Sequence, residues 1–249
     1  MDSITEKKVM PLKVSSVKDT CVRLLENKIL SGEWKIGMHL PSERSLAKSL
    51  EISRIILHEA IVDLAAKGLV TIQPRRGIFV NDFRKQGSCG LLSSLMAYQN
   101  GGLDETFIQS LVDMRLLLET ETARMATSQR TVEHISELNR IYLSEKQTDR
   151  SDYKLLTDLD FTFHQQIAIA SGNLMYPLII NSFKNVYTKL TGLFFQHLHD
   201  QSEIDQLFDF HLNLIHAIES RDEEKAETTM RSMLKHGSTL LYGLLERSS

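Results

Sequence analysis

One pair of side chains has the spacing of a metal site or an acid–base pair. Asp160 and His164 lie four residues apart in the segment DLDFTFH, so on a helix they stand one turn apart on the same face. A carboxylate and an imidazole in this arrangement are either two of the ligands of a divalent cation or a pair that bond each other at the edge of a core. The outcome depends on which further ligands the chain supplies.

The stretch around this pair has the periodicity of helices. Beyond residue 83 we find no further convincing strand, and apolar stripes recur between short polar or glycine-containing breaks. The pattern predicts an all-α bundle of six or seven helices with its own core. The helices are expected at approximately residues 91–100, 104–127, 131–147, 152–171, 174–199, 202–220 and 222–246.

Residues 14–68 predict three shorter helices. The first has apolar residues at nearly helical spacing and stops at Gly32. The second follows Ser42 and the third follows Ser53, both natural N-caps, and the third ends at Gly68. The connection between the second and third helices is short, which is typical of a helix-turn-helix.

The residues after Gly68 change period and predict a β-hairpin. Residues 69–72 and 78–80 are short β-branched or aromatic runs, and Pro74 to Gly77 lie between them. Three helices followed by a hairpin with a basic tip make a winged helix, so the expected fold is mainly α, a winged helix-turn-helix joined to an all-α bundle. The predicted parts are an N-terminal extension (1–13), the winged helix-turn-helix (14–82), a linker (83–90) and the helical domain (91–249).

The composition is that of a soluble globular protein, with 42% hydrophobic and 24% charged residues among 249. We find no apolar run long enough to cross a membrane and no secretory h-region in MDSITEKKVM. Two cysteines, Cys21 and Cys89, favour a reducing, cytoplasmic location. Residues 1–82 are mildly basic and the remainder is acidic, which is compatible with a polyanion at one end only.

The winged helix predicts contacts to double-stranded DNA. In a helix-turn-helix the second helix lies in the major groove, with its N-terminal side chains on base edges. A basic hairpin tip reaches a phosphate or the minor groove, where contacts set affinity more than sequence. The alternative is a surface unit that only packs. The candidate contacts are Arg44, Ser53, Arg54 and His58 on the helices and Arg75 and Arg76 on the tip.

The segment from Leu40 to Val80 resembles the winged-helix domain of GntR-type bacterial transcription regulators. The match covers roughly residues 16–81, and it implies DNA contacts by Arg44, by Arg54 and by the wing from Arg75 to Gly77. His58 stands where the family usually has Arg, and Arg76 replaces the first Gly of the usual pair. The matching motifs are Pro41–Arg44, Leu46–Ala47, Ser53–Arg54, Glu59–Ala60, Gly68–Leu69 and Gly77–Val80.

Residues from roughly 90 to 240 resemble the FCD ligand-binding domain of the FadR branch of that family. The similarity rests on Arg115 in MRLLLETETARMA, on Asp160-x-x-Phe163-His164, on ASGN at 170–173 and on HLNLIHAI. Two segments, FVNDF leading to GLL and ASGNLMYPLIINSFKNVYTKL, look especially like the acyl-CoA-responsive fatty-acid regulators of that branch. The implied effector is a small organic acid or an acyl-CoA.

The FCD resemblance also implies a divalent metal (Zn, Ni or Mn) held by one Asp and three His. Asp160, His164 and His211 match three of these positions, and the fourth falls on Met233. A thioether is a poor ligand for such ions, and His236, three residues further, is a possible substitute. The alternative is that Asp160 bonds His164 and that both are structural or touch the effector directly.

Arg115 has two readings. A guanidinium that faces a helical cavity is suited to bind a carboxylate or phosphate of the effector. Alternatively, Arg115 forms an ion pair with Glu119, four residues on, or with a carboxylate of another helix. The remaining histidines of the helical part, His197, His199 and His216, are expected at the surface or in packing.

These features predict a transcriptional regulator and not an enzyme. We expect a ligand-responsive repressor that binds a pseudo-palindromic operator as a homodimer, with the effector in the helical domain. Since the sign of regulation does not follow from the residues, activation stays open. The alternatives are a metal-dependent hydrolase that uses Asp160, His164 and His211, and a DNA-binding protein that responds to no ligand.

Overall fold

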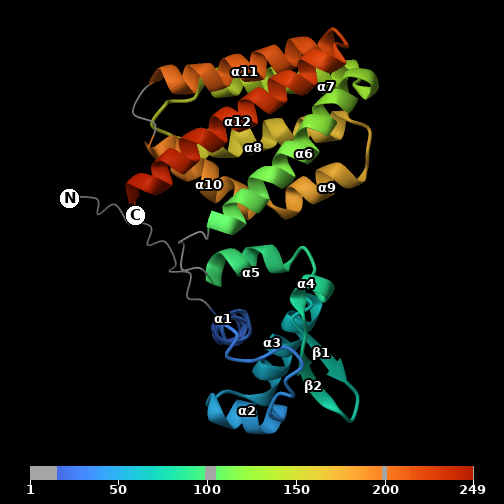
Figure 1. The fold of residues 1–249 in the computed structure, drawn as a ribbon, viewed down its shortest axis with the longest axis vertical. Helices are drawn as coiled ribbons and strands as arrows, with labels where there is room; N and C mark the ends of the chain where they lie inside the picture. Colours follow the sequence, from blue (N-terminus) through green and yellow to red (C-terminus); the bar gives the residue numbers. More distant parts are fainter. Residues whose placement is uncertain (1–15, 99–104, 198–200, 249) are drawn as a thin grey trace, which may run out of the picture. The chain divides into compact units, whose positions relative to one another are not determined.

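The computed structural model describes residues 16–98, 105–197 and 201–248. These residues form two compact units, one within residues 16–98 and the other within residues 105–248 (Figure 1). The N-terminal extension predicted at 1–13 lies outside the described residues. Among the described helices, none combines the length and the apolar character needed to span a membrane.

The first unit is a winged helix-turn-helix, as the sequence predicts. Ser42 and Ser53 are the N-caps of the second and third helices, because their hydroxyls accept from the backbone N–H groups of Ser45 and Ile56. The elements are α1 (Val17–Leu30), α2 (Glu43–Ser49), α3 (Arg54–Ala66), β1 (Val70–Gln73), β2 (Gly77–Val80), α4 (Phe83–Gln86) and α5 (Leu91–Tyr98).

The hairpin is antiparallel and packs one face on the helices. Val70 pairs with Val80 and Ile72 with Ile78. Ile78 and Val80 point into a core that includes Leu57 and Leu64 of α3. Residues 38–40 run along the other edge of β2, where the Leu40 N–H donates to the carbonyl of Ile78.

Helix α5 belongs to the first unit, although residues 91–98 were expected in the helical domain. Leu91 is buried in the winged-helix core. Behind it, the Lys67 ammonium donates to Glu26 of α1 at 2.5 Å and to the Ser94 hydroxyl at 2.9 Å, and that hydroxyl donates to Glu26 at 2.8 Å. This network of partly buried polar groups ties α5 to α1. The expected linker at 83–90 contains the short helix α4, which Asp82 caps.

The second unit is an all-α bundle built around α8. This helix packs against α6, α7, α9 and α10, while α12 lies along α6 and against α11 (Figure 1). Phe163 of α8, Phe195 of α10 and Phe208 of α11 are fully buried in its core. The elements are α6 (Glu105–Gln129), α7 (Val132–Gln147), α8 (Tyr153–Ala170), α9 (Met175–Ser182), α10 (Lys184–His197), α11 (Gln201–Glu219) and α12 (Glu223–Ser248).

The segment expected as one helix at 174–199 is two helices, α9 and α10. The break falls at Phe183, which ends α9 with φ −95° and ψ 0°. Just before it, the Ser182 hydroxyl donates to the carbonyl of Ile179 at 2.6 Å. Such side-chain bonds compete with the helical ladder. No Gly or Pro lies at the break, and the apolar periodicity continues across it, which is why the sequence predicts a single helix here.

Candidate functional site

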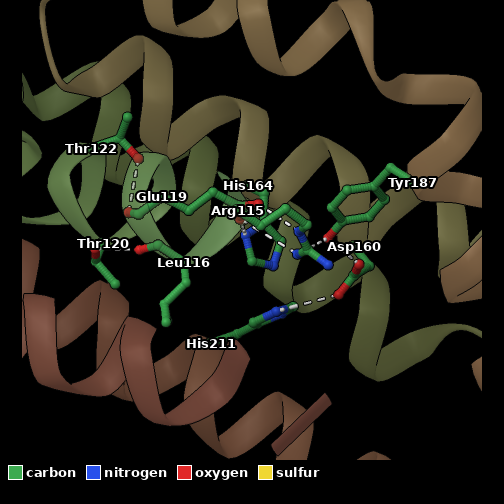
Figure 2. Close-up of polar contacts among 9 residues, drawn as sticks. All are labelled: Arg115, Leu116, Glu119, Thr120, Thr122, Asp160, His164, Tyr187 and His211. Carbon is green, nitrogen blue, oxygen red and sulfur yellow. Dashed lines mark hydrogen bonds and ion pairs between the residues drawn. The ribbon is translucent and has the colours of Figure 1, made fainter. Parts of the chain in front are cut away.

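The polar centre of the helical unit is built by four helices. Asp160 and His164 project from α8 and His211 from α11, and all three are at most 4% exposed. One carboxylate oxygen and one ring nitrogen from each imidazole lie within 4.8 Å of one another. Helices α6 and α10 complete the centre with Arg115, Glu119 and Tyr187 (Figure 2). The structure therefore brings together the predicted residues Arg115, Asp160, His164 and His211.

Each imidazole of this cluster is held from behind by a carboxylate. The Nδ1 atom of His164 contacts Oε2 of Glu119, and Nδ1 of His211 bonds Oε2 of Glu145 at 2.8 Å. Carboxylates in this position fix the orientation of a metal-ligating histidine and raise its basicity. The alternative in which Asp160 bonds His164 is not what the structure shows. Asp160 accepts from the Tyr187 hydroxyl at 2.6 Å, and Nδ1 of His164 contacts Glu119.

His211 carries the observation that bears most directly on a metal. Its Nε2 atom is buried and has no hydrogen bond among the described residues. Its contact is a long ion pair with Asp160 Oδ1 at 3.7 Å (Figure 2). A buried ring nitrogen without a hydrogen bond costs free energy. A cation shared by Asp160, His164 and His211 would satisfy it. The donor set of two imidazoles and a carboxylate suits zinc, nickel or manganese.

The charges around the cluster also favour a cation. Three carboxyl groups, those of Glu119, Glu145 and Asp160, contact the two imidazoles, and Arg115 pairs with Glu119. Burial disfavours a charged Glu119, but Arg115 and His164 outweigh burial and hold its pKa at about 2.

Arg115 serves Glu119 and Tyr187 at once. Its Nε donates to Glu119 Oε1 at 2.6 Å, and its terminal nitrogen donates to the Tyr187 hydroxyl at 3.1 Å. The guanidinium carbon lies 4.1 Å from the centre of the Tyr187 ring. Burial raises the pKa of Tyr187 well above its usual 10, so the phenol stays protonated as a donor. The ion pair that we considered for Arg115 is present, and Arg115 also lines the cavity described next.

A cavity of about 80 Å³ opens from the polar centre. Arg115, Asp160, His164 and Tyr187 form one side of it. Most of the other lining residues are apolar, and they include Met233 of α12, which is 2% exposed. His236 is not in the group of ligand atoms or in the cavity wall, and its ring lies 5.9 Å from that of Phe210. The apolar wall consists of residues such as Leu111, Leu190, Phe194 and Leu241.

Two residues of the polar centre, Glu145 and Tyr187, were not predicted from the sequence. Glu145 is 1% exposed and follows Leu138 and Ile141 along the buried face of α7. An acid at a core position of an amphipathic helix is a signal that could have marked it. Tyr187 lies on a helix whose start was not predicted, so its direction could not be inferred.

A pH effect on stability follows from the surroundings of His211. Burial opposes a charge on this ring, but Glu145 and Asp160 outweigh burial and raise its pKa above the usual 6.5. A group with a raised folded pKa stabilises the fold below its unfolded pKa, and this contribution disappears as the pH rises through the folded value. We therefore expect the melting temperature of the metal-free protein to fall above pH 6.5. Melts across this range, compared with the variant His211→Gln, measure the effect; equal pH profiles would contradict it.

On the winged helix, the predicted DNA contacts lie on exposed positions. Arg44 and Arg54 are exposed at the N-terminal ends of α2 and α3, and Arg75 and Arg76 are exposed at the hairpin tip. None of these four arginines has an ion pair with a carboxylate among the described residues.

The other three predicted contacts are engaged within the protein. The Ser53 hydroxyl caps α3. The Nδ1 atom of His58 lies 3.1 Å from Glu43 Oε1, so its Nε2 edge is the one left to face a ligand. Gly77 has φ +102°, which a residue with a side chain rarely adopts, and this places its role in the backbone of the turn.

Comparisons with known proteins agree with both units. Residues 18–80 match the model of the bacterial regulatory proteins of the gntR family, and residues 110–236 match the FCD domain. A fatty acid metabolism regulator protein of Yersinia enterocolitica is 28% identical over 186 residues, which cover 75% of each chain. A relative with the same name from Yersinia pestis is 27% identical over the same length.

Solved structures support the fold. Lar of Listeria monocytogenes superposes with a TM-score of 0.61 at 19% identity, covering 92% of this chain and 98% of Lar. McbR/YncC of E. coli gives a TM-score of 0.51 at 14% identity, covering 92% and 99%. From the two matched domains and their order, the chain belongs to the GntR family of DNA-binding transcription regulators, with an FCD domain as its effector module, and it is a regulator and not an enzyme.

Proposed function

We propose that the protein is a cytosolic, ligand-responsive repressor that binds a pseudo-palindromic operator as a homodimer. Helix-turn-helix proteins meet paired half-sites with two-fold symmetry, which supports the dimer. The observation that carries the sensing role is the buried Nε2 atom of His211, which has no hydrogen bond and lies beside Asp160 and His164, two residues that line a cavity. Such a group points to a bound ion or ligand.

In this proposal Asp160, His164 and His211 hold a divalent metal. When bound, the metal supplies a Lewis-acid position for an oxygen of the effector. Glu119 and Glu145 orient the two imidazoles, while Tyr187 donates to Asp160 and fixes its carboxylate. Arg115 presents positive charge at the same end of the cavity, where an effector carboxylate or phosphate would bind.

The effector is proposed to be an organic acid with an apolar portion. The cavity is lined by a polar group that includes Arg115 and by apolar residues such as Leu190 and Phe194. A fatty acyl group has the same division into a polar head and an apolar chain, and the Yersinia relatives are named for fatty acid metabolism. Because the cavity measures about 80 Å³ and ligand sites usually measure roughly 300–1,000 Å³, the helices would have to move apart to admit a long chain. A small hydrophilic acid would use the polar end alone.

Ligand binding changes DNA binding only if the effector binds two arrangements of the protein with different affinity. A thermal-shift screen of short organic acids, fatty acids and acyl-CoAs, each with and without zinc, tests the sensing role. At about 100 times the dissociation constant, a specific ligand stabilises the protein by roughly 2.7 kcal/mol. If every compound leaves the melting temperature unchanged, the protein is a ligand-independent DNA-binding protein and this part of the proposal fails.

Two arginines of the winged helix are expected to contribute differently to DNA binding. Arg54→Ala should reduce discrimination between operator and random DNA by about 1–3 kcal/mol, because an arginine on a base edge reads sequence. Arg75→Ala should weaken both about equally and lower the salt slope by about 1, because a phosphate contact carries no sequence information. Fluorescence anisotropy at several salt concentrations measures both. Unchanged discrimination in Arg54→Ala would contradict the assignment.

A further inference from the structure

The tip of the wing has a strained backbone conformation that needs a stabilising contact. Arg75 has φ +64°, a left-handed conformation that costs a non-glycine residue roughly 1 kcal/mol. The Arg76 N–H donates to the carbonyl of Gln73 at 3.0 Å and closes the turn. The two exposed arginine side chains therefore start from a short, strained turn, and their direction depends on what stabilises it.

His39 is placed to stabilise that turn from outside the hairpin. It belongs to the segment that runs antiparallel to β2, where it forms a bridge with Phe79. On either side of His39, Met38 accepts from the Val80 N–H at 3.0 Å and Leu40 donates to Ile78 at 2.8 Å. These backbone hydrogen bonds therefore hold the backbone of His39 in place independently of its side chain.

The His39 ring reaches the tip of the wing. Its centre lies 5.0 Å from that of Phe79, and its Nε2 atom lies 3.0 Å from the carbonyl oxygen of Arg76. A carbonyl oxygen only accepts, so Nε2 carries the proton and donates. This bond joins the peptide group between Arg76 and Gly77 to a separate segment of the unit.

Gly77 and His39 are matched to each other. A Cβ atom on residue 77 would lie 2.3 Å from His39 Nε2, so the imidazole would have to move away from the turn to make room for it. The imidazole therefore occupies the space that any side chain at 77 would need. The same glycine also supplies the φ of +102° that the turn requires.

We propose that His39 is a positioning residue for the DNA-contacting wing: its Nε2–H holds the Arg76 carbonyl and so sets the direction of Arg75 and Arg76. The inference rests on the proposed phosphate contacts of these two arginines. His39 also precedes the N-terminus of α2 at Glu43 by only four residues. It therefore links the wing to the start of the helix-turn-helix within one unit.

The test is a double-mutant cycle read out by DNA binding. The variants are His39→Leu, Arg75→Ala/Arg76→Ala and the triple combination, and the probe is a random-sequence DNA duplex titrated at several salt concentrations by anisotropy. Loss of two phosphate contacts should reduce the slope of log affinity against log salt by about 2. We expect His39→Leu to lower the slope by about 1 or more in the otherwise wild-type protein and to have no further effect in the triple variant. His39→Gln, whose amide can donate to the same carbonyl, should recover most of the binding.

Other results separate the ways in which the inference can fail. If His39→Leu weakens binding equally on both backgrounds, His39 contacts DNA directly and does not position the arginines. If it lowers the melting temperature and leaves the salt slope unchanged, its role is only structural. If Arg75→Ala/Arg76→Ala binds like the wild type, the proposed wing contacts themselves are wrong, and the inference about His39 falls with them.

Discussion

Replacing His211 with glutamine is expected to abolish tight zinc binding. The imidazole is fully buried, and Glu145 holds its Nδ1 atom so that Nε2 faces Asp160. Removal of a carboxylate behind a metal-ligating histidine already costs ~10–100-fold in affinity, and removal of the ligand itself should cost more. Glutamine keeps a polar side chain of similar length, which limits the disturbance of the core. Isothermal titration of the metal-free protein with zinc measures the loss.

The same helix provides the control. His216 lies five residues further along α11 and is exposed, so His216→Ala should bind zinc like the wild type. Circular dichroism of both variants checks that the fold persists. Wild-type affinity in a folded His211→Gln variant would contradict the assignment of His211 as a ligand.

Replacing Met233 with histidine is expected to strengthen zinc binding by on the order of 10- to 100-fold. The new imidazole would add a fourth protein ligand, and zinc favours four ligands that include nitrogen. Met233 is buried on α12 and lines the cavity together with Asp160 and His164. Its thioether is a poor ligand for borderline divalent ions. In the proposed site Asp160, His164 and His211 would be the three protein ligands, and residue 233 is the position where the chain could offer a fourth.

Met233→Leu is the matched control, because leucine keeps the volume and the apolar character without the sulfur. We expect zinc affinity in Met233→Leu to equal that of the wild type. A marked loss in Met233→Leu would mean that the thioether itself is a ligand. An unchanged affinity in Met233→His would mean that residue 233 does not face the ion.

Local signals in the sequence were sufficient for the winged helix. Ser42 and Ser53 are strong N-caps followed by helical periodicity, and the change of period after Gly68 marks the hairpin. These features depend on neighbouring residues alone. The affiliation of α5 depends on Glu26, Lys67 and Ser94, which meet across 68 positions of sequence. Periodicity carries no information about such contacts.

The residues of the candidate site also fall into those that the sequence predicts and those that it does not. Spacing and family resemblance suffice to place Asp160 and His164 on one face of α8 and to add His211. The groups that hold them are remote in sequence, since Glu145 bonds His211 from 66 positions away and Tyr187 bonds Asp160 from 27. The break at Phe183 sets the start of α10 and with it the direction of Tyr187. A distant side chain can be placed only when the packing of the helices is known.

Native mass spectrometry of the protein purified from cells supplied with zinc tests the central claim most directly, because it reads the stoichiometry of chain, ion and ligand in one spectrum. We predict a dimer in which each chain carries one divalent ion and an organic acid or acyl-CoA. Both additions should be absent from His211→Gln and present in His216→Ala. A wild-type spectrum with bare chain masses, or additions of equal size in His211→Gln, would contradict a metal-supported effector site in the helical unit.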